Sequence, residues 1–124
     1  MYKKFFIIFF YLLLSINIFA NNIYTEGDLI LKNDIFYEIK SEEPANGIKK
    51  IYNKNGSLFA ESPYENGKVN GIVKLYFENG ALMGETPYKN NKMNGLVKAY
   101  FENGALRMEV QYKDGERNGY EKYY

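Results

Sequence analysis

The dipeptide Asn-Gly returns every 24 residues along most of this 124-residue chain, at Asn46-Gly47, Asn70-Gly71, Asn94-Gly95 and Asn118-Gly119. Six further positions keep the same period: Lys50, Lys74, Lys98 and Lys122; Tyr52, Tyr76, Tyr100 and Tyr124; Gly56, Gly80 and Gly104; Leu58, Leu82 and Leu106; Glu61, Glu85 and Glu109; and Tyr64, Tyr88 and Tyr112. Such self-similarity is typical of repeat proteins, in which equivalent units stack on one another. The period therefore predicts a stacked array.

Each unit has the pattern of a β-hairpin. In the middle copy, the β-rich run 72–77 leads to Asn79-Gly80, and 82–88 forms the returning strand. Asn-Gly between two such runs is a strong hairpin signal, because a type I′ turn needs a positive φ at both central residues. A looser connection is expected at 89–92. The predicted fold is all-β, an elongated antiparallel array of hairpins.

The length of the hairpin loop decides which residues share a face of the sheet. With a two-residue loop, Phe77 pairs with Leu82 and Lys74 with Glu85. The equivalent pairs in the next copy are Phe101 with Leu106 and Lys98 with Glu109. One face then carries Val97, Ala99, Phe101, Leu106, Met108, Val110 and Tyr112, and the other carries Leu96, Lys98, Tyr100, Arg107, Glu109 and Gln111. A three-residue loop would shift the pairing by one and place Lys98 among the apolar residues. The two-residue loop is favoured because it separates apolar from polar side chains.

Residues 1–20 have the pattern of a secretory signal peptide. Lys3 and Lys4 precede the apolar run 5–14, and the small residue Ala20 marks the predicted cleavage site. The alternative is a retained membrane anchor. As a helix, 5–20 would span only roughly 24 Å of a hydrocarbon layer about 30 Å thick. Cleavage and export to the periplasm or the medium are therefore preferred over anchoring.

The rest of the chain divides into a cap and the repeats. Residues 21–45 contain a degenerate hairpin, with Asn33-Asp34 in place of Asn-Gly, and atypical terminal units commonly cap an array. The repeat region 46–124 comprises 46–69, 70–93, 94–117 and the half repeat 118–124. This sequence predicts about nine strands and no second layer to cover the apolar side of the sheet.

Composition argues against catalysis. The chain has no Cys and no His, which excludes thiolate nucleophiles, imidazole bases and zinc sites that need either residue. One glutamate per repeat, about 10 Å from the next, is too far to share an ion or flank a bond. A formal net charge of +1 does not indicate a nucleic acid partner. The sequence therefore predicts no enzyme, no metal and no cofactor.

Three segments carry a family resemblance: 94–106 (NGLVKAYFENGAL), 112–115 (YKDG) and 44–47 (PANG). They resemble the MORN-variant repeat and, more narrowly, the bacterial YwqK-family antitoxins. The resemblance implies an elongated β-hairpin array that serves as a binding surface, without catalytic residues. The antitoxin label implies a neutralising complex with a toxin protein, and an exported relative implies an immunity-type binder or an envelope interaction protein.

The candidate partner-binding residues are the regularly spaced aromatic and basic side chains: Phe77, Phe101, Tyr76, Tyr100, Tyr88, Tyr112, Lys74 and Lys98. Tyrosine is enriched at binding hot spots, although a repeated tyrosine in a sheet also serves packing. The predicted function is an exported protein that binds a toxin-like or envelope protein. The alternative is an envelope-associated module that binds anionic lipid or polysaccharide through the lysine row. Glutamates expected opposite the lysines would neutralise that row.

Overall fold

A computed structural model describes residues 22–124, so the predicted signal peptide and its cleavage site lie outside the described residues. The strands are β1 (Asn22–Tyr24), β2 (Leu29–Lys32), β3 (Ile35–Glu38), β4 (Gly47–Tyr52), β5 (Leu58–Glu65), β6 (Lys68–Val69), β7 (Gly71–Tyr76), β8 (Leu82–Lys89), β9 (Lys92–Met93), β10 (Gly95–Tyr100), β11 (Leu106–Lys113) and β12 (Glu116–Tyr123). Residues 22–124 contain no helix, and hence none with the length and apolar character needed to cross a membrane. The predicted all-β class is confirmed.

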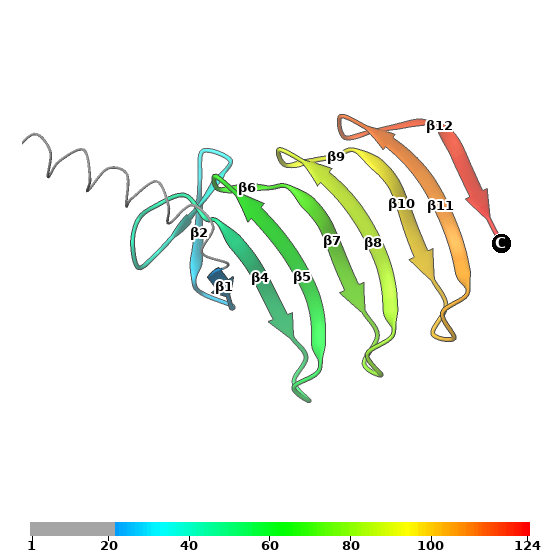
Figure 1. The fold of residues 1–124 in the computed structure, drawn as a ribbon, viewed down its shortest axis with the longest axis horizontal. Helices are drawn as coiled ribbons and strands as arrows, with labels where there is room; N and C mark the ends of the chain where they lie inside the picture. The colour runs from blue at the N-terminus through cyan, green and yellow to red at the C-terminus, as the bar shows by residue number, and fades with distance from the viewer. Residues whose placement is uncertain (1–21) are drawn as a thin grey trace, which may run out of the picture.

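Ten of the strands form one long sheet in which consecutive hairpins lie side by side (Figure 1). The order along the sheet is β1-β4-β5-β7-β8-β10-β11-β12, with the short strands β6 and β9 paired to β5 and β8. All neighbours are antiparallel except β1, which runs parallel to β4 at the N-terminal end. Among the described elements, substantial contacts occur only between neighbouring strands, so the sheet is a single layer.

The hairpin loops within the repeats are longer than predicted. The amide of Gly80 donates to the carbonyl of Phe77 over 2.9 Å, and the amide of Phe77 donates to Ala81 over 2.8 Å. Gly80 has a φ of 85°, whereas Asn79 keeps a negative φ, so this is not a type I′ turn. Instead the Asn79 side chain accepts a bond from the Ala81 amide. The predicted two-residue loop is wrong, because this side chain stabilises a three-residue loop, 78–80.

A β-bulge one pair further on compensates for the extra loop residue. Tyr76 pairs with Leu82 and Leu75 with Gly84, so Met83 has no counterpart on β7. Phe59 and Arg107 are the extra residues of the other two hairpins. A bulge inserts one residue on one strand only and thereby shifts the register back by one.

The bulge confirms some predicted pairs and overturns others. Lys74 does pair with Glu85, and Lys98 with Glu109. The predicted pairs Phe77–Leu82 and Phe101–Leu106 are wrong, because Tyr76 and Tyr100 lie opposite these leucines. The two faces predicted for Phe101 and Arg107 are also not kept apart, since the Arg107 guanidinium lies 5.7 Å from the centre of the Phe101 ring.

The type I′ turns are found between the repeats, where a looser connection was predicted. Both central residues have positive φ at Asn66-Gly67 (50° and 76°), Asn90-Asn91 (49° and 70°) and Asp114-Gly115 (50° and 87°). The second residue of each turn donates its amide to the preceding unit: Gly67 to Ala45, Asn91 to Val69 and Gly115 to Met93, over 2.8–2.9 Å. These turns therefore stack along one edge of the sheet and hold consecutive units in step.

The N-terminal cap contacts the first of these turns. Strands β2 and β3 pair around Asn33-Asp34, where the degenerate hairpin was predicted. The Phe36 amide donates to the Gly67 carbonyl over 2.7 Å, and the Phe36 ring meets the Tyr64 ring edge-on. A Cβ atom on Gly67 would lie 2.3 Å from the Ile35 side chain, so only glycine allows this approach.

Candidate functional site

A row of alternating charges crosses the repeat sheet on one of its faces. Through consecutive strand pairs it runs Lys50, Glu61, Lys74, Glu85, Lys98, Glu109 and Lys122. We call this row the charge ladder and its side of the sheet the ladder face. Each internal lysine lies between two glutamates on neighbouring strands. This arrangement favours the observed strand register over registers shifted by one residue. The predicted opposition of lysine and glutamate is confirmed.

A second row on the ladder face consists of tyrosines whose hydroxyls bind the ladder. Tyr76 donates to Glu61 over 2.8 Å and Tyr100 to Glu85 over 3.0 Å. Tyr124 makes the equivalent bond to Glu109 over 2.9 Å. Burial, together with the hydrogen bond to Glu61, raises the pKa of Tyr76 to about 12. The pKa of Tyr100 is raised by burial and then by Glu85. Both phenols are therefore neutral donors at physiological pH.

An apolar strip accompanies the ladder on its other side. It consists of Ile48 and Pro63, Ile72 and Pro87, and Leu96, which alternate with the ladder positions along their strands. Ile72 is 49% exposed. The ladder face thus combines three chemically different stripes, one aromatic, one charged and one aliphatic.

The opposite side of the sheet is almost uniformly uncharged, and we call it the apolar face. Between β5 and β11 it carries Ala60, Ser62, Tyr64, Gly71, Val73, Leu75, Gly84, Thr86, Tyr88, Gly95, Val97, Ala99, Met108, Val110 and Tyr112. Ala60 lies between Ile51 and Leu75, and Val110 lies between Val97 and Glu121. These two residues are only 5% and 3% exposed. Most other members are half-buried. At the N-terminal end the β2–β3 hairpin reaches this face, where the Phe36 ring meets Tyr64. Among the described elements, none packs across the rest of the face.

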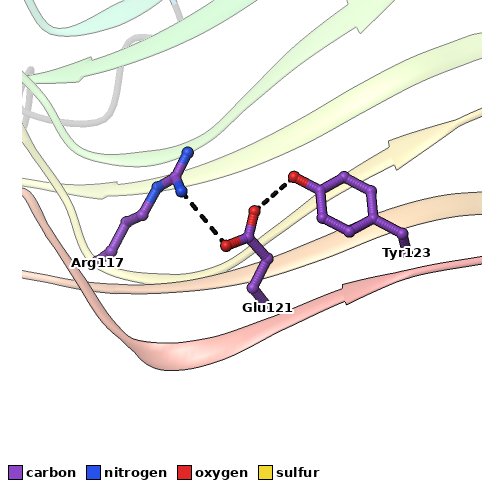
Figure 2. A network of polar contacts seen from close by, with 3 residues as sticks. All are labelled: Arg117, Glu121 and Tyr123. Atoms are coloured by element: carbon purple, nitrogen blue, oxygen red, sulfur yellow. Dashed lines mark hydrogen bonds and ion pairs between the residues drawn. The ribbon is translucent and has the colours of Figure 1, made fainter.

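Charged residues enter the apolar face only at the ends of the array. At the C-terminal end, Glu121 lies opposite Val110, and its carboxylate accepts hydrogen bonds from Arg117 and Tyr123 (Figure 2). The Arg117–Glu121 ion pair measures 3.3 Å. At the N-terminal end, Lys49 lies opposite Ser62. The central part of the face has no charged member.

The structure divides the predicted binding residues between the two faces. Tyr76, Tyr100, Lys74 and Lys98 lie on the ladder face, whereas Tyr88 and Tyr112 belong to the apolar face. Phe77 and Phe101 close the hairpin loops through their backbone amides. The eight residues therefore do not form a single surface. The aliphatic members of the apolar face, such as Val73, Leu75 and Val97, were not predicted as binding residues, although strict alternation with Lys74 and Lys98 marks them in the sequence.

Potential metal ligands are spread out in the part of the chain that the structure describes. Within residues 22–124, no group of three or more His, Cys, Asp or Glu side chains is placed to hold a metal ion. The ladder glutamates are one per repeat and are engaged by tyrosine hydroxyls. What the arrangement can do chemically is present two extended and different surfaces.

Sequence comparison agrees with this repeat geometry. The profile of the MORN repeat variant matches three consecutive segments, 45–66, 69–90 and 93–114, and each contains one long hairpin, β4–β5, β7–β8 or β10–β11. The chain belongs to the MORN repeat variant family. MORN repeats generally serve as binding modules for proteins or membrane lipids. No curated protein and no solved structure matches the chain.

Proposed function

We propose that this MORN repeat protein is exported and binds another protein through its apolar face, in the manner of an antitoxin or an immunity protein. The observation that carries the proposal is the uncovered, uncharged centre of that face, from Ala60 on β5 to Val110 on β11. Large apolar patches without a covering layer mark interaction sites. Depletion of charge at the centre is also the compositional signal of protein interfaces.

The charge ladder favours a protein over an anionic lipid surface as the partner. Recognition of anionic headgroups relies on clustered lysines and arginines. On the ladder face, Lys74 has Glu61 and Glu85 as its neighbours, and Lys98 has Glu85 and Glu109. This alternation cancels most of the attraction that a row of cations would exert.

Export is supported by the sequence pattern before the described residues. Lys3 and Lys4 followed by the apolar run 5–14 would direct the chain to the periplasm or the medium. There the partner would be a toxin-like protein or an envelope protein. The exported protein should begin at Asn21, and Edman sequencing of material purified from its own cells checks this. A different first residue contradicts the cleavage site, and a protein that starts at Met1 contradicts export through cleavage.

The binding proposal is tested by affinity purification with matched variants. Thr86→Lys places a charge in the middle of the apolar face, and Gln111→Lys places the same charge on the ladder face. We expect a co-purifying protein that is retained by the wild type and by Gln111→Lys but lost with Thr86→Lys, while circular dichroism shows that all three are folded. Retention should persist above about 0.15 M salt, where charges are screened beyond about 8 Å. Retention by Thr86→Lys, or release by salt, would contradict the proposal.

A further inference from the structure

We propose that the ladder face is a second binding site, which takes a proline-rich peptide segment in the polyproline II conformation. The site is built from Tyr52, Tyr76 and Tyr100, which we call the tyrosine row, and from the neighbouring lysines of the charge ladder. It lies on the opposite side of the sheet from the apolar face. The two sites can therefore be tested separately.

The spacing of the tyrosine row selects the conformation of the ligand. Neighbouring strands are about 4.8 Å apart, and each repeat contributes two, so successive tyrosines lie about 9.6 Å apart. A polyproline II helix has three residues per turn and rises about 3.1 Å per residue. Every third side chain therefore points to the same side, at a spacing of about 9.3 Å. In a β-strand every second side chain points to the same side, at a spacing of about 6.8 Å. This spacing does not match the distance between successive tyrosines.

Two rings of the row are held by equivalent hydrogen bonds. The hydroxyls of Tyr76 and Tyr100 donate to Glu61 and Glu85 on the preceding hairpin, so both side chains extend along the sheet in the same direction. Tyr52 is 51% exposed. Tyr124 continues the row but is not part of the site, because the Lys122 ammonium lies 4.4 Å from the centre of its ring. The two hydrogen-bonded rings and the exposed ring of Tyr52 remain, and proline-rich segments dock on aromatic-lined surfaces.

The lysines supply the polar part of the recognition. A polyproline II segment has no internal hydrogen bonds, so its carbonyls need donors from the partner. Lys74 and Lys98 are adjacent to the rings and repeat with the same period. Among residues 22–124 neither takes part in an ion pair, whereas Lys50 is paired with Glu61 at 3.5 Å. Their ammonium groups are thus free to donate to carbonyls that face the sheet.

The test is a titration of the purified protein with a synthetic peptide that has proline at every third position and alanine elsewhere. Such a peptide reaches all three rings with about seven residues. Backbone amide NMR shifts should move for Tyr76, Tyr100 and the ladder lysines. A second peptide with proline at every fourth position is the register control, and we expect it to bind at least about tenfold more weakly.

Matched variants distinguish binding at this site from non-specific binding of the peptide. Tyr100→Leu keeps an apolar side chain in place but removes the ring, and it should weaken the peptide at least about tenfold. Tyr88→Leu makes the same change on the apolar face and should leave the affinity unchanged, as should Thr86→Lys. Circular dichroism and amide spectra establish that each variant is folded. If Tyr100→Leu does not fold, Lys98→Met provides the second variant, and it should weaken the peptide several-fold.

Three results would overturn the proposal. The first is the absence of shifts with the peptide of three-residue spacing at millimolar concentration. The second is equal binding of the two peptides, or loss of binding with Tyr88→Leu but not with Tyr100→Leu. The third is a response of Tyr76 and Tyr100 to a soluble β-1,4-linked oligosaccharide and not to the peptide, which would assign the row to a glycan. The proposed protein partner of the apolar face has a separate test, the affinity purification with Thr86→Lys and Gln111→Lys.

Discussion

The two faces of the repeat sheet are built from the same 24-residue unit but are stabilised differently. On the ladder face, Glu61 accepts a hydrogen bond from Tyr76 and lies opposite Lys74 on the neighbouring strand. On the apolar face, Leu75 and Val97 lie among uncharged neighbours and nothing described covers them. Because side chains alternate strictly along a strand, a register slip of one residue would exchange the two sets. The difference between the faces therefore depends on the register, and the bulges at Phe59, Met83 and Arg107 maintain it.

The largest expected effect separates a buried position on the apolar face from its half-buried neighbour on the ladder face. Val110 is 3% exposed on the apolar face, and Gln111 follows it on the ladder face. Val110→Asp would bury an unpaired carboxylate and should lower the free energy of unfolding by more than about 3 kcal/mol. Gln111→Asp should change it by no more than about 0.5 kcal/mol. Urea denaturation followed by circular dichroism measures both, and similar losses for the two variants would show that the faces do not differ in this way.

The sequence predicted the hairpin array and the cross-strand pairs of lysine and glutamate because both follow directly from the period and from alternation. It did not predict the turns correctly, because Asn-Gly is compatible with two geometries. Asn79-Gly80 forms a three-residue loop, whereas Asn66-Gly67 forms the type I′ turn. The loop adds one residue and the bulge at Met83 offsets it, so the register equals the predicted one beyond the bulge but not next to the loop. Because the longer loop and the bulge compensate for each other, the 24-residue period does not reveal either of them.

The candidate site was predicted in its residue types but not in its organisation. The predicted register placed Tyr100 and Tyr112 on opposite faces, as the structure does, but the candidate binding residues were taken from both faces as one set. The hydroxyl contacts of the tyrosines with glutamates of the preceding hairpin join residues 15 positions apart across two strands. Such diagonal contacts depend on the side-chain directions, which a repeat pattern does not contain.

An intermediate effect is expected from reversing one charge of the ladder. Lys98 lies between Glu85 and Glu109, so Lys98→Glu would place three carboxylates side by side. Each cross-strand pair contributes roughly 0.2–1 kcal/mol, so we expect a loss of about 1–2 kcal/mol that becomes smaller at high salt. Thermal unfolding at low and high ionic strength measures it.

Lys89 provides the matched control for this substitution. It lies directly opposite Lys92, and like charges at such a position are unfavourable. Lys89→Glu should therefore leave the free energy of unfolding unchanged or raise it slightly. Any such gain in stability should become smaller at high salt. A loss of stability with Lys89→Glu that equals the loss with Lys98→Glu would mean that the ladder has no special role.

The smallest effect tests the bond between the tyrosine row and the ladder. Tyr76→Phe keeps the ring but removes the hydroxyl that donates to Glu61, so it should cost about 1 kcal/mol at neutral pH. Tyr88→Phe on the apolar face has no ladder glutamate within reach and should cost less. Chemical denaturation of the two variants in parallel measures the difference.

The pH dependence of this difference follows from the raised pKa of Tyr76. Burial and the bond to Glu61 raise that pKa to about 12 in the folded protein, whereas an unfolded tyrosine titrates near 10. Folding thus favours the neutral phenol. The contribution of the Tyr76 hydroxyl to the free energy of unfolding is complete below about pH 10 and is lost as the pH rises toward about 12. The stability difference between wild type and Tyr76→Phe should accordingly shrink over this range. A difference that stays constant as the pH rises would mean that the Tyr76 hydroxyl does not bind Glu61 in solution, and the common direction of the Tyr76 and Tyr100 side chains would lose its basis.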